Sequence, residues 1–102
     1  MKRPAIRVEL PFHLQTLART AHSIEVGPPA DATLGSVLDA VEAAYPMLRG
    51  TIRDHSTLKR RPFLRFFACG RDFSDADPST PLPDAVSRGE APLLIIGAIA
   101  GG

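Results

Sequence analysis

The residues best suited to chemistry are the two glycines at the end of the sequence. Gly101 and Gly102 follow an apolar run of strand length, residues 93–100. A terminal glycine carries its α-carboxylate with no Cβ beside it, and the glycine before it accepts almost any φ. A tail without side chains therefore fits a narrow channel and can present its reactive carboxylate inside that channel. The alternative is a frayed end or a cloning remnant, because chain ends are commonly disordered.

The composition of the chain predicts the class of the domain that precedes this tail. The chain has 102 residues, of which 44% are apolar, and a net charge of +1. This size and apolar content predict one globular domain over residues 1–102. A charge so close to zero gives no bias toward nucleic acid or a membrane surface. Cys69 is the only cysteine, which excludes an intramolecular disulfide and a disulfide-stapled scaffold.

The ends of the sequence also predict the compartment. Residues 1–4 lead directly into an amphipathic strand, so we expect no signal peptide. The apolar run near the end is about half of the roughly 20 residues that a membrane-spanning helix needs. We therefore expect a cytoplasmic protein that does not contact a membrane.

Two alternating segments predict the first two strands. Residues 6–10 and 23–26 alternate apolar and polar side chains, which indicates half-buried strands that pair as a hairpin with a long connection. The connection, residues 12–22, has only a weak helical pattern. We expect Leu14 and Leu17 to be its core anchors.

The clearest helix follows, over residues 34–45. Thr33 is the expected N-cap, and Pro46 stops the helix because the residue before a proline is pushed out of the α region. Apolar residues recur at helical spacing and predict one buried stripe: Leu34, Val37, Leu38, Val41 and Tyr45. The intervening polar residues are expected to face water: Ser36, Asp39 and Glu42. Beyond the helix, three residues are expected in the core: Met47, Leu48 and Ile52.

The remaining elements are shorter. Residues 63–68 form an aromatic-rich strand, residues 69–70 a tight turn, and residues 71–73 a returning strand. Residues 74–90 are expected to be a long loop anchored by Leu82. The order of elements predicts an α+β roll, a mixed sheet of four or five strands packed on one main helix. Its first and last strands would lie parallel at the sheet centre, with the last strand buried on at least one face.

This order, followed by Gly-Gly, resembles the β-grasp fold of ubiquitin-like sulfur carriers. That family includes the small subunit of molybdopterin synthase and the carrier of thiamine thiazole synthesis. The resemblance covers nearly the whole chain and rests on an ordered set of segments: residues 32–35 with Leu38, 45–46, 61–72, 80–82 and 95–102. The chain departs from the family at residues 87–90, where an acidic turn is usual, and at Gly97, where proline is common.

The resemblance implies a specific chemistry for the tail. A partner of the ubiquitin-activating type would use ATP to convert the Gly102 carboxylate to an acyl-adenylate. Sulfide or a persulfide would then displace AMP and leave a thiocarboxylate that donates sulfur to an acceptor. Gly102 would be the modified residue, Gly101 would give it access, and residues 98–102 would form a flexible tail. The chain would hold no catalytic residue and no bound cofactor.

The implied partners are the adenylating enzyme and a sulfur-accepting synthase, either a large subunit or a thiazole or cysteine synthase. The pathway stays open among molybdenum cofactor, thiamine, cysteine, thiolated tRNA and an accessory biosynthetic route. Two rival functions also stay open. One is a β-grasp adaptor whose tail does no chemistry, and the other is conjugation of Gly102 to a lysine through the same adenylate.

Strand alternation predicts a docking face on the sheet. Leu94 and Ile96 on the last strand and Phe67 on the aromatic strand should point away from the core and form an exposed apolar patch, with Phe63 and Arg65 beside it. Exposed apolar patches commonly mark interaction sites, and ubiquitin-like proteins use this face. The alternative is that the loop from residue 74 folds over the patch as a satellite core.

Other reactive residue types give weaker signals. Five cations form a modest cluster that either steers the domain to an acidic partner surface or is a solvated face: Lys59, Arg60, Arg61, Arg65 and Arg71. Cys69 stands where the turn needs φ > 0 and is interpreted as a structural residue, with a redox-sensitive thiol as the alternative. The three histidines lack the spacing of metal ligands relative to Cys69, so no metal site is expected: His13, His22 and His55.

Overall fold

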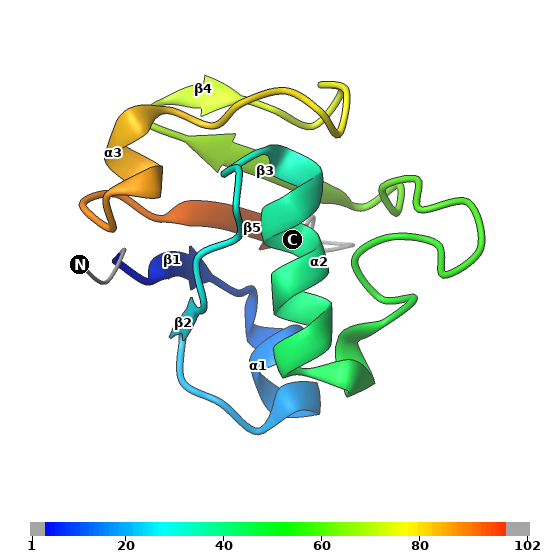
Figure 1. The fold of residues 1–102 in the computed structure, drawn as a ribbon. Coiled ribbons are helices and arrows are strands. Elements are labelled where there is room, and N and C mark those ends of the chain that lie inside the picture. Colours follow the sequence, from blue (N-terminus) through cyan, green and yellow to red (C-terminus); the bar gives the residue numbers. More distant parts are fainter. Residues whose placement is uncertain (1–3, 98–102) are drawn as a thin grey trace.

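A five-stranded sheet with one principal helix on one face organises the chain (Figure 1). The structure is a computed structural model and describes residues 4–97. Its elements run in this order: β1 (Ile6–Glu9), α1 (Phe12–Ala18), β2 (Ser23–Val26), α2 (Leu34–Ala44), the 3₁₀ turn η1 (Pro46–Leu48), β3 (Leu64–Ala68), β4 (Arg71–Asp72), α3 (Asp84–Ser87) and β5 (Leu93–Gly97). The predicted residues 98–102 of the tail lie outside the described residues.

The sheet has the order β2-β1-β5-β3-β4, and only the β1–β5 pair is parallel among the pairs of this sheet. β1 and β2 pair antiparallel, as the sequence predicts, and α1 occupies the long connection between them. The last strand therefore lies in the middle of the sheet, between the first strand and β3. This is the predicted α+β roll, with the topology of a β-grasp fold.

The main helix forms where its signals predict it. Thr33 Oγ1 accepts a hydrogen bond from the Ser36 backbone N–H at 3.1 Å, and the Thr33 backbone N–H donates to Ser36 Oγ at 2.9 Å. This reciprocal capping box satisfies donors that the first helical turn leaves free. α2 ends at Ala44, just before Pro46.

Four expectations about individual positions are wrong. Leu17 is 47% exposed, and Ala18 is buried in its place because α1 turns that position toward the core. Met47 is 48% exposed on η1, whereas Leu48 and Ile52 are buried as predicted. Within residues 74–90, predicted as loop, α3 forms and buries Val86, although Leu82 is buried as expected.

The fourth correction concerns Glu42, which is buried and not facing water. Its carboxylate accepts from Arg53 Nε at 3.0 Å, and Arg53 Nη2 donates to Asp39 at 2.7 Å. Burial of the guanidinium by itself would lower the pKa of Arg53, but the hydrogen bonds to Glu42 and Asp39 raise it above its ordinary value. Arg53 thereby ties the connection after α2 to the polar side of that helix.

Within the described part of the chain, no helix is both long enough and apolar enough to cross a membrane.

The buried ion pair leads to a stability prediction. We expect Arg53→Met to lower the free energy of unfolding by about 3 kcal/mol, because the Glu42 carboxylate would stay buried without its partner. Urea denaturation measures this directly. The double variant Arg53→Met/Glu42→Leu should recover much of the loss. Equal stability of Arg53→Met and the wild type would contradict the assignment.

Candidate functional site

The described part of the candidate site is the face of the sheet opposite α2. Residues of β5 alternate along its length: Leu93 and Ile95 are buried toward the helix, Leu94 is half-buried on the other side, and Ile96 is 45% exposed there. The alternation follows from the two-residue period of a strand. Gly97 ends β5, and the chain continues from it toward Gly101 and Gly102.

The neighbouring strand completes an apolar area on this face. β3 pairs antiparallel with β5, with Phe67 opposite Leu94 and Arg65 opposite Ile96. Side chains of directly paired residues lie on the same side of a sheet. Phe67, Leu94 and Ile96 therefore adjoin one another, and we call these three residues the open-face patch.

The two residues predicted beside the patch occupy different positions. Arg65 lies next to Ile96 across the strands and is exposed. Phe63 is 71% exposed and comes directly before Leu64, the partner of Gly97. It therefore lies near the end of β5 from which the chain continues. The structure thus places Arg65, Phe67, Leu94 and Ile96 on one side of β3 and β5 and Phe63 in the turn before β3. Their partner-binding role stays a prediction.

The loop after β4, which is the alternative cover for the open-face patch, lies elsewhere at residues 78–80. The Leu34 and Gly35 backbone N–H groups at the start of α2 donate to the carbonyls of Thr80 and Pro78 at 3.0 and 2.8 Å. A Cβ on Gly35 would lie 3.0 Å from the Pro78 side chain, so the glycine permits this close approach. This part of the loop therefore lies against α2, on the helix side of the sheet.

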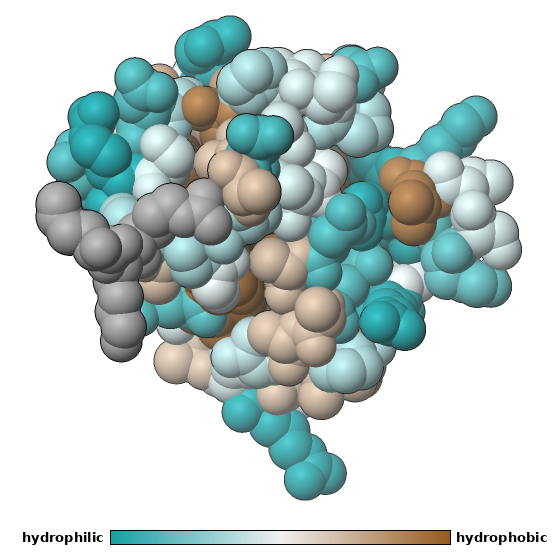
Figure 2. Space-filling view, viewed as in Figure 1, coloured by the Kyte–Doolittle hydropathy of each residue, from teal (hydrophilic) through white to brown (hydrophobic). Residues whose placement is uncertain are grey.

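The helix side has a different character from the patch. Hydrophilic and near-neutral residues make up most of the face seen in Figure 2, and apolar residues appear there as small separate areas. α2 crosses the front of the sheet in the same view (Figure 1). The open-face patch lies on the far side of the sheet from this view.

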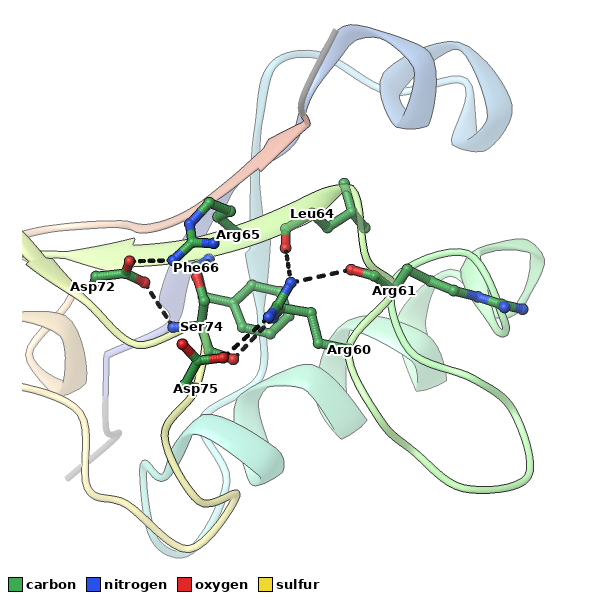
Figure 3. A network of polar contacts seen from close by, with 8 residues as sticks. All are labelled: Arg60, Arg61, Leu64, Arg65, Phe66, Asp72, Ser74 and Asp75. Atoms are coloured by element: carbon green, nitrogen blue, oxygen red, sulfur yellow. Dashed lines mark hydrogen bonds and ion pairs between the residues drawn. The ribbon is translucent and has the colours of Figure 1, made fainter. Parts of the chain in front are cut away.

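Polar interactions fix the edge of the patch. Arg65 Nη2 donates to Asp72 Oδ2 at 2.6 Å, and Asp72 Oδ1 accepts from the Ser74 backbone N–H at 2.8 Å (Figure 3). The Arg65 guanidinium, with a smaller effect of Ser74, lowers the pKa of Asp72 far below its ordinary value. The ion pair lies on exposed strand residues and forms a charged border beside the apolar residues.

The predicted basic cluster is largely engaged within the chain. Arg60 donates to the carbonyls of Ser74 at 2.9 Å and Leu64 at 2.7 Å, and it pairs with Asp75 at 3.1 Å (Figure 3). These contacts join the segment before β3 to the segment after β4. Arg60 is therefore a structural tie and not part of a free basic surface.

Other members of the cluster also have partners inside the chain. Arg61 Nε donates to the Gly50 carbonyl at 2.7 Å, and the Arg71 guanidinium lies 5.0 Å from the centre of the Phe73 ring. With Arg65 paired to Asp72, four of the five cations interact with other groups of the chain. The choice between steering toward an acidic partner and a solvated face stays a prediction.

Cys69 has the conformation that the turn requires. Its φ is +51°, and that of Gly70 is +77°, in the two-residue turn joining β3 to β4. The thiol is free and exposed. The positive φ supports the interpretation as a turn residue, and the redox alternative is left untested. Among the described residues, no group of three or more His, Cys, Asp or Glu could hold a metal ion.

Sequence reasoning missed one part of the surface, a groove beside the end of β5. It has a volume of about 650 Å³ and lies between the start of α1 and the last residues of β5. Phe12 and His13 line it, and Phe12 is 79% exposed. The available signal was Pro11 directly before Phe12, because an extended proline can precede the first helical turn.

Comparisons with known proteins give fold likeness alone. No protein-family model matches the chain, and no curated protein sequence does. SAMP1 from Haloferax volcanii superposes with a TM-score of 0.72 at 19% identity, covering 97% of this chain and 100% of that one. A chain of the Amycolatopsis orientalis BexX/CysO complex gives 0.73 at 22% identity, covering 96% and 100%. CysO from Mycobacterium tuberculosis gives 0.70 at 21% identity, covering 91% and 98%.

The border of the patch leads to a prediction about pH. Asp72 has a lower pKa in the folded chain than in the unfolded chain, where a value of about 3.9 applies. Its ionised form therefore adds stability above that pH, and this contribution is lost as the pH falls through the folded pKa. We expect the free energy of unfolding of Asp72→Asn to fall less steeply than that of the wild type below about pH 4. Urea titrations at several pH values measure the slopes, and parallel curves would contradict the assignment.

The patch leads to a second prediction. A charge at its most exposed residue should block docking without disturbing the core, so Ile96→Asp should weaken partner binding by about 30-fold or more. The partner here is an adenylating enzyme that acts on the wild-type chain, and calorimetry measures the affinity. Phe67→Asp should abolish partner binding and leave the thermal stability of the chain nearly unchanged. Met47→Asp, at similar exposure on η1, is the control and should bind normally. A collapse of the fold in both patch variants would show that the face is assigned wrongly.

The structural likeness to SAMP1 and CysO, together with the strand order, establishes that the chain has the β-grasp fold of ubiquitin-like proteins.

Proposed function

We propose that this chain is a sulfur carrier whose Gly102 is activated by a separate adenylating enzyme. One observation carries the proposal: a β-grasp domain has its last strand at the sheet centre, and the sequence Gly101-Gly102 follows that strand after three residues. The pairing of β5 with both β1 and β3 gives the tail a fixed point of departure at Gly97. The proposal requires that Gly102 carry a free carboxylate in the working protein.

The chemistry runs in two steps. A carboxylate oxygen of Gly102 attacks the α-phosphorus of ATP, the bond to the β-phosphate breaks, and pyrophosphate leaves. Hydrosulfide then attacks the acyl carbon of the adenylate, the bond to the AMP oxygen breaks, and AMP departs with its electron pair. The product is a thiocarboxylate. With a persulfide as donor, the first product is an acyl disulfide, and a thiol must reduce it to release the thiocarboxylate.

The chain itself has a binding role in these steps. A glycine at position 101 leaves room for a channel to close around the backbone, and the absence of a Cβ at Gly102 keeps the acyl carbon accessible. ATP belongs to the activating partner, and a sulfur-accepting synthase, either a large subunit or a thiazole or cysteine synthase, would use the product. In this proposal the chain works in the cytoplasm as a substrate and carrier, not as an enzyme.

A second function is favoured by a specific observation. Of two structures from Haloferax volcanii with the same fold, one is described as SAMP1 and the other as small archaeal modifier protein 1. Conjugation would use the same adenylate, but the acyl group would pass to a lysine amine. The two functions differ in the final acceptor and not in the first step. An adaptor with an inert tail is the third possibility.

The direct test is the intact mass of the chain after incubation with ATP, sulfide and each of a panel of ubiquitin-activating-type enzymes. We expect one enzyme to raise the mass by about 16 Da, the replacement of one oxygen by sulfur. A variant lacking Gly102 should show no increase and lose all carrier activity, whereas an adaptor would keep its partner binding without that residue. Absence of the increase with every enzyme would count against the proposal.

A matched pair of glycine variants tests the role of the tail. Gly101→Val should slow adenylation on the order of 100-fold, because a branched side chain would hold the acyl carbon away from the reacting phosphorus. Gly27→Val is the control, because a Cβ there meets open space. ATP–pyrophosphate exchange measures both rates. Equal rates would mean that position 101 does not enter a narrow channel.

A further inference from the structure

The α1 groove is a second surface feature at the base of the tail. It is the depression of about 650 Å³ between the start of α1 and the end of β5. Pro11, Phe12 and His13 form one side, and Ile96 and Gly97 form the other. Figure 3 shows β5 and the chain that enters α1 side by side in the upper half of the view.

Gly97 sets the distance between the two sides of the groove. A Cβ at this position would lie 3.1 Å from His13 Cε1 and 3.4 Å from Pro11 Cβ. A side chain there would require the His13 ring and Pro11 to shift by a few tenths of an ångström. Glycine at position 97 therefore permits the close approach of Pro11 and His13 to the end of β5.

Hydrogen bonds hold the polar end of the groove in place. Gln15 Nε2 donates to the Leu10 carbonyl at 2.8 Å and lies 3.3 Å from His22 Nδ1. His22 Nε2 in turn lies 3.1 Å from a carboxylate oxygen of Glu9. These contacts link α1, β1 and the start of β2, so the groove is formed before any partner binds.

The apolar part of the groove is left open. Phe12 is 79% exposed and Ile96 is 45% exposed, although both adjoin the same depression. Leu17 on the same helix is 47% exposed but does not line the groove. An aromatic ring and a branched aliphatic side chain around a preformed depression favour an apolar ligand group, because burying them removes apolar surface from water.

We propose that the α1 groove receives an apolar side chain, aromatic or branched aliphatic, from the rim of the adenylating enzyme that charges Gly102. This inference rests on the proposed function. Gly102 is five residues beyond Gly97, so an extended backbone spans at most about 18 Å between them. A partner that encloses Gly102 must therefore stand over the end of β5, where the α1 groove opens. The groove is continuous with the open-face patch through Leu94 and Ile96, so one partner surface covers both.

The test compares two aspartates on one helix. The probe is the enzyme that charges the wild-type chain, and the readouts are its affinity by calorimetry and the rate of ATP–pyrophosphate exchange. Phe12→Asp should weaken binding by about 30-fold and raise the KM for the carrier, with little change in kcat at saturation. Leu17→Asp should behave as the wild type. Phe12→Leu should keep most of the affinity, because an apolar side chain still borders the groove. Circular dichroism and the thermal midpoint show whether each variant is folded.

The outcomes separate this inference from the proposed function. If the wild type is charged and Phe12→Asp binds equally well, the groove inference is wrong and the carrier function stands. If no enzyme charges the wild type, both are wrong. Loss of a wild-type dimer in Phe12→Asp, seen by ultracentrifugation, would assign the groove to a second copy and overturn the inference. Normal charging of Phe12→Asp with defective sulfur delivery would assign it to the acceptor and overturn it as well.

Discussion

The placement of β5 between β1 and β3 is the constraint on which the other features of this molecule depend. A central strand can bury one row of side chains against α2 while its other row lies on the opposite face. Leu93 and Ile95 take the first role, and Leu94 and Ile96 take the second. The five residues of β5 thus supply core packing, two of the three residues of the open-face patch, and one wall of the α1 groove. A shift of register by one residue would exchange the rows and bury the patch.

Arginine side chains hold the irregular segments around this strand. Arg53 joins the connection after α2 to Glu42, and Arg60 joins the segments that flank the β3–β4 hairpin. Each guanidinium reaches several acceptors at once, which suits a small domain with long connections. The basic residues therefore support the shape of the surface, and the apolar residues supply its binding potential. This division explains why a cluster of arginines in the sequence does not form a free basic surface.

Elements with a clear period or a clear stop were predictable from the sequence. The alternation in β1, the Thr33 cap and the Cys69-Gly70 turn each have a local cause, and the structure agrees with them. Glu42 was predicted wrongly because its partner Arg53 is eleven residues away, and helical periodicity carries no information about such a pair. α3 was missed because four residues are too few for a period to appear.

Part of the site was predictable because it follows from the two-residue alternation of a strand. Strand alternation was sufficient to place Phe67, Leu94 and Ile96 on one face. The α1 groove was not foreseen, because it depends on the contact of Gly97 with His13, which no local pattern encodes. At Gly97, where the resemblance makes proline common, a Cβ would lie 3.1 Å from His13 Cε1.

The most direct test of the central claim is the mass of the chain isolated from its own cells, without added enzyme or sulfide. A carrier should be found with Gly102 as its last residue, and part of the population should bear one sulfur in place of an oxygen. Fragmentation should assign that sulfur to the glycyl carboxylate. A population in which the backbone continues beyond Gly102, or in which no growth condition yields the sulfur-bearing form, would contradict the account.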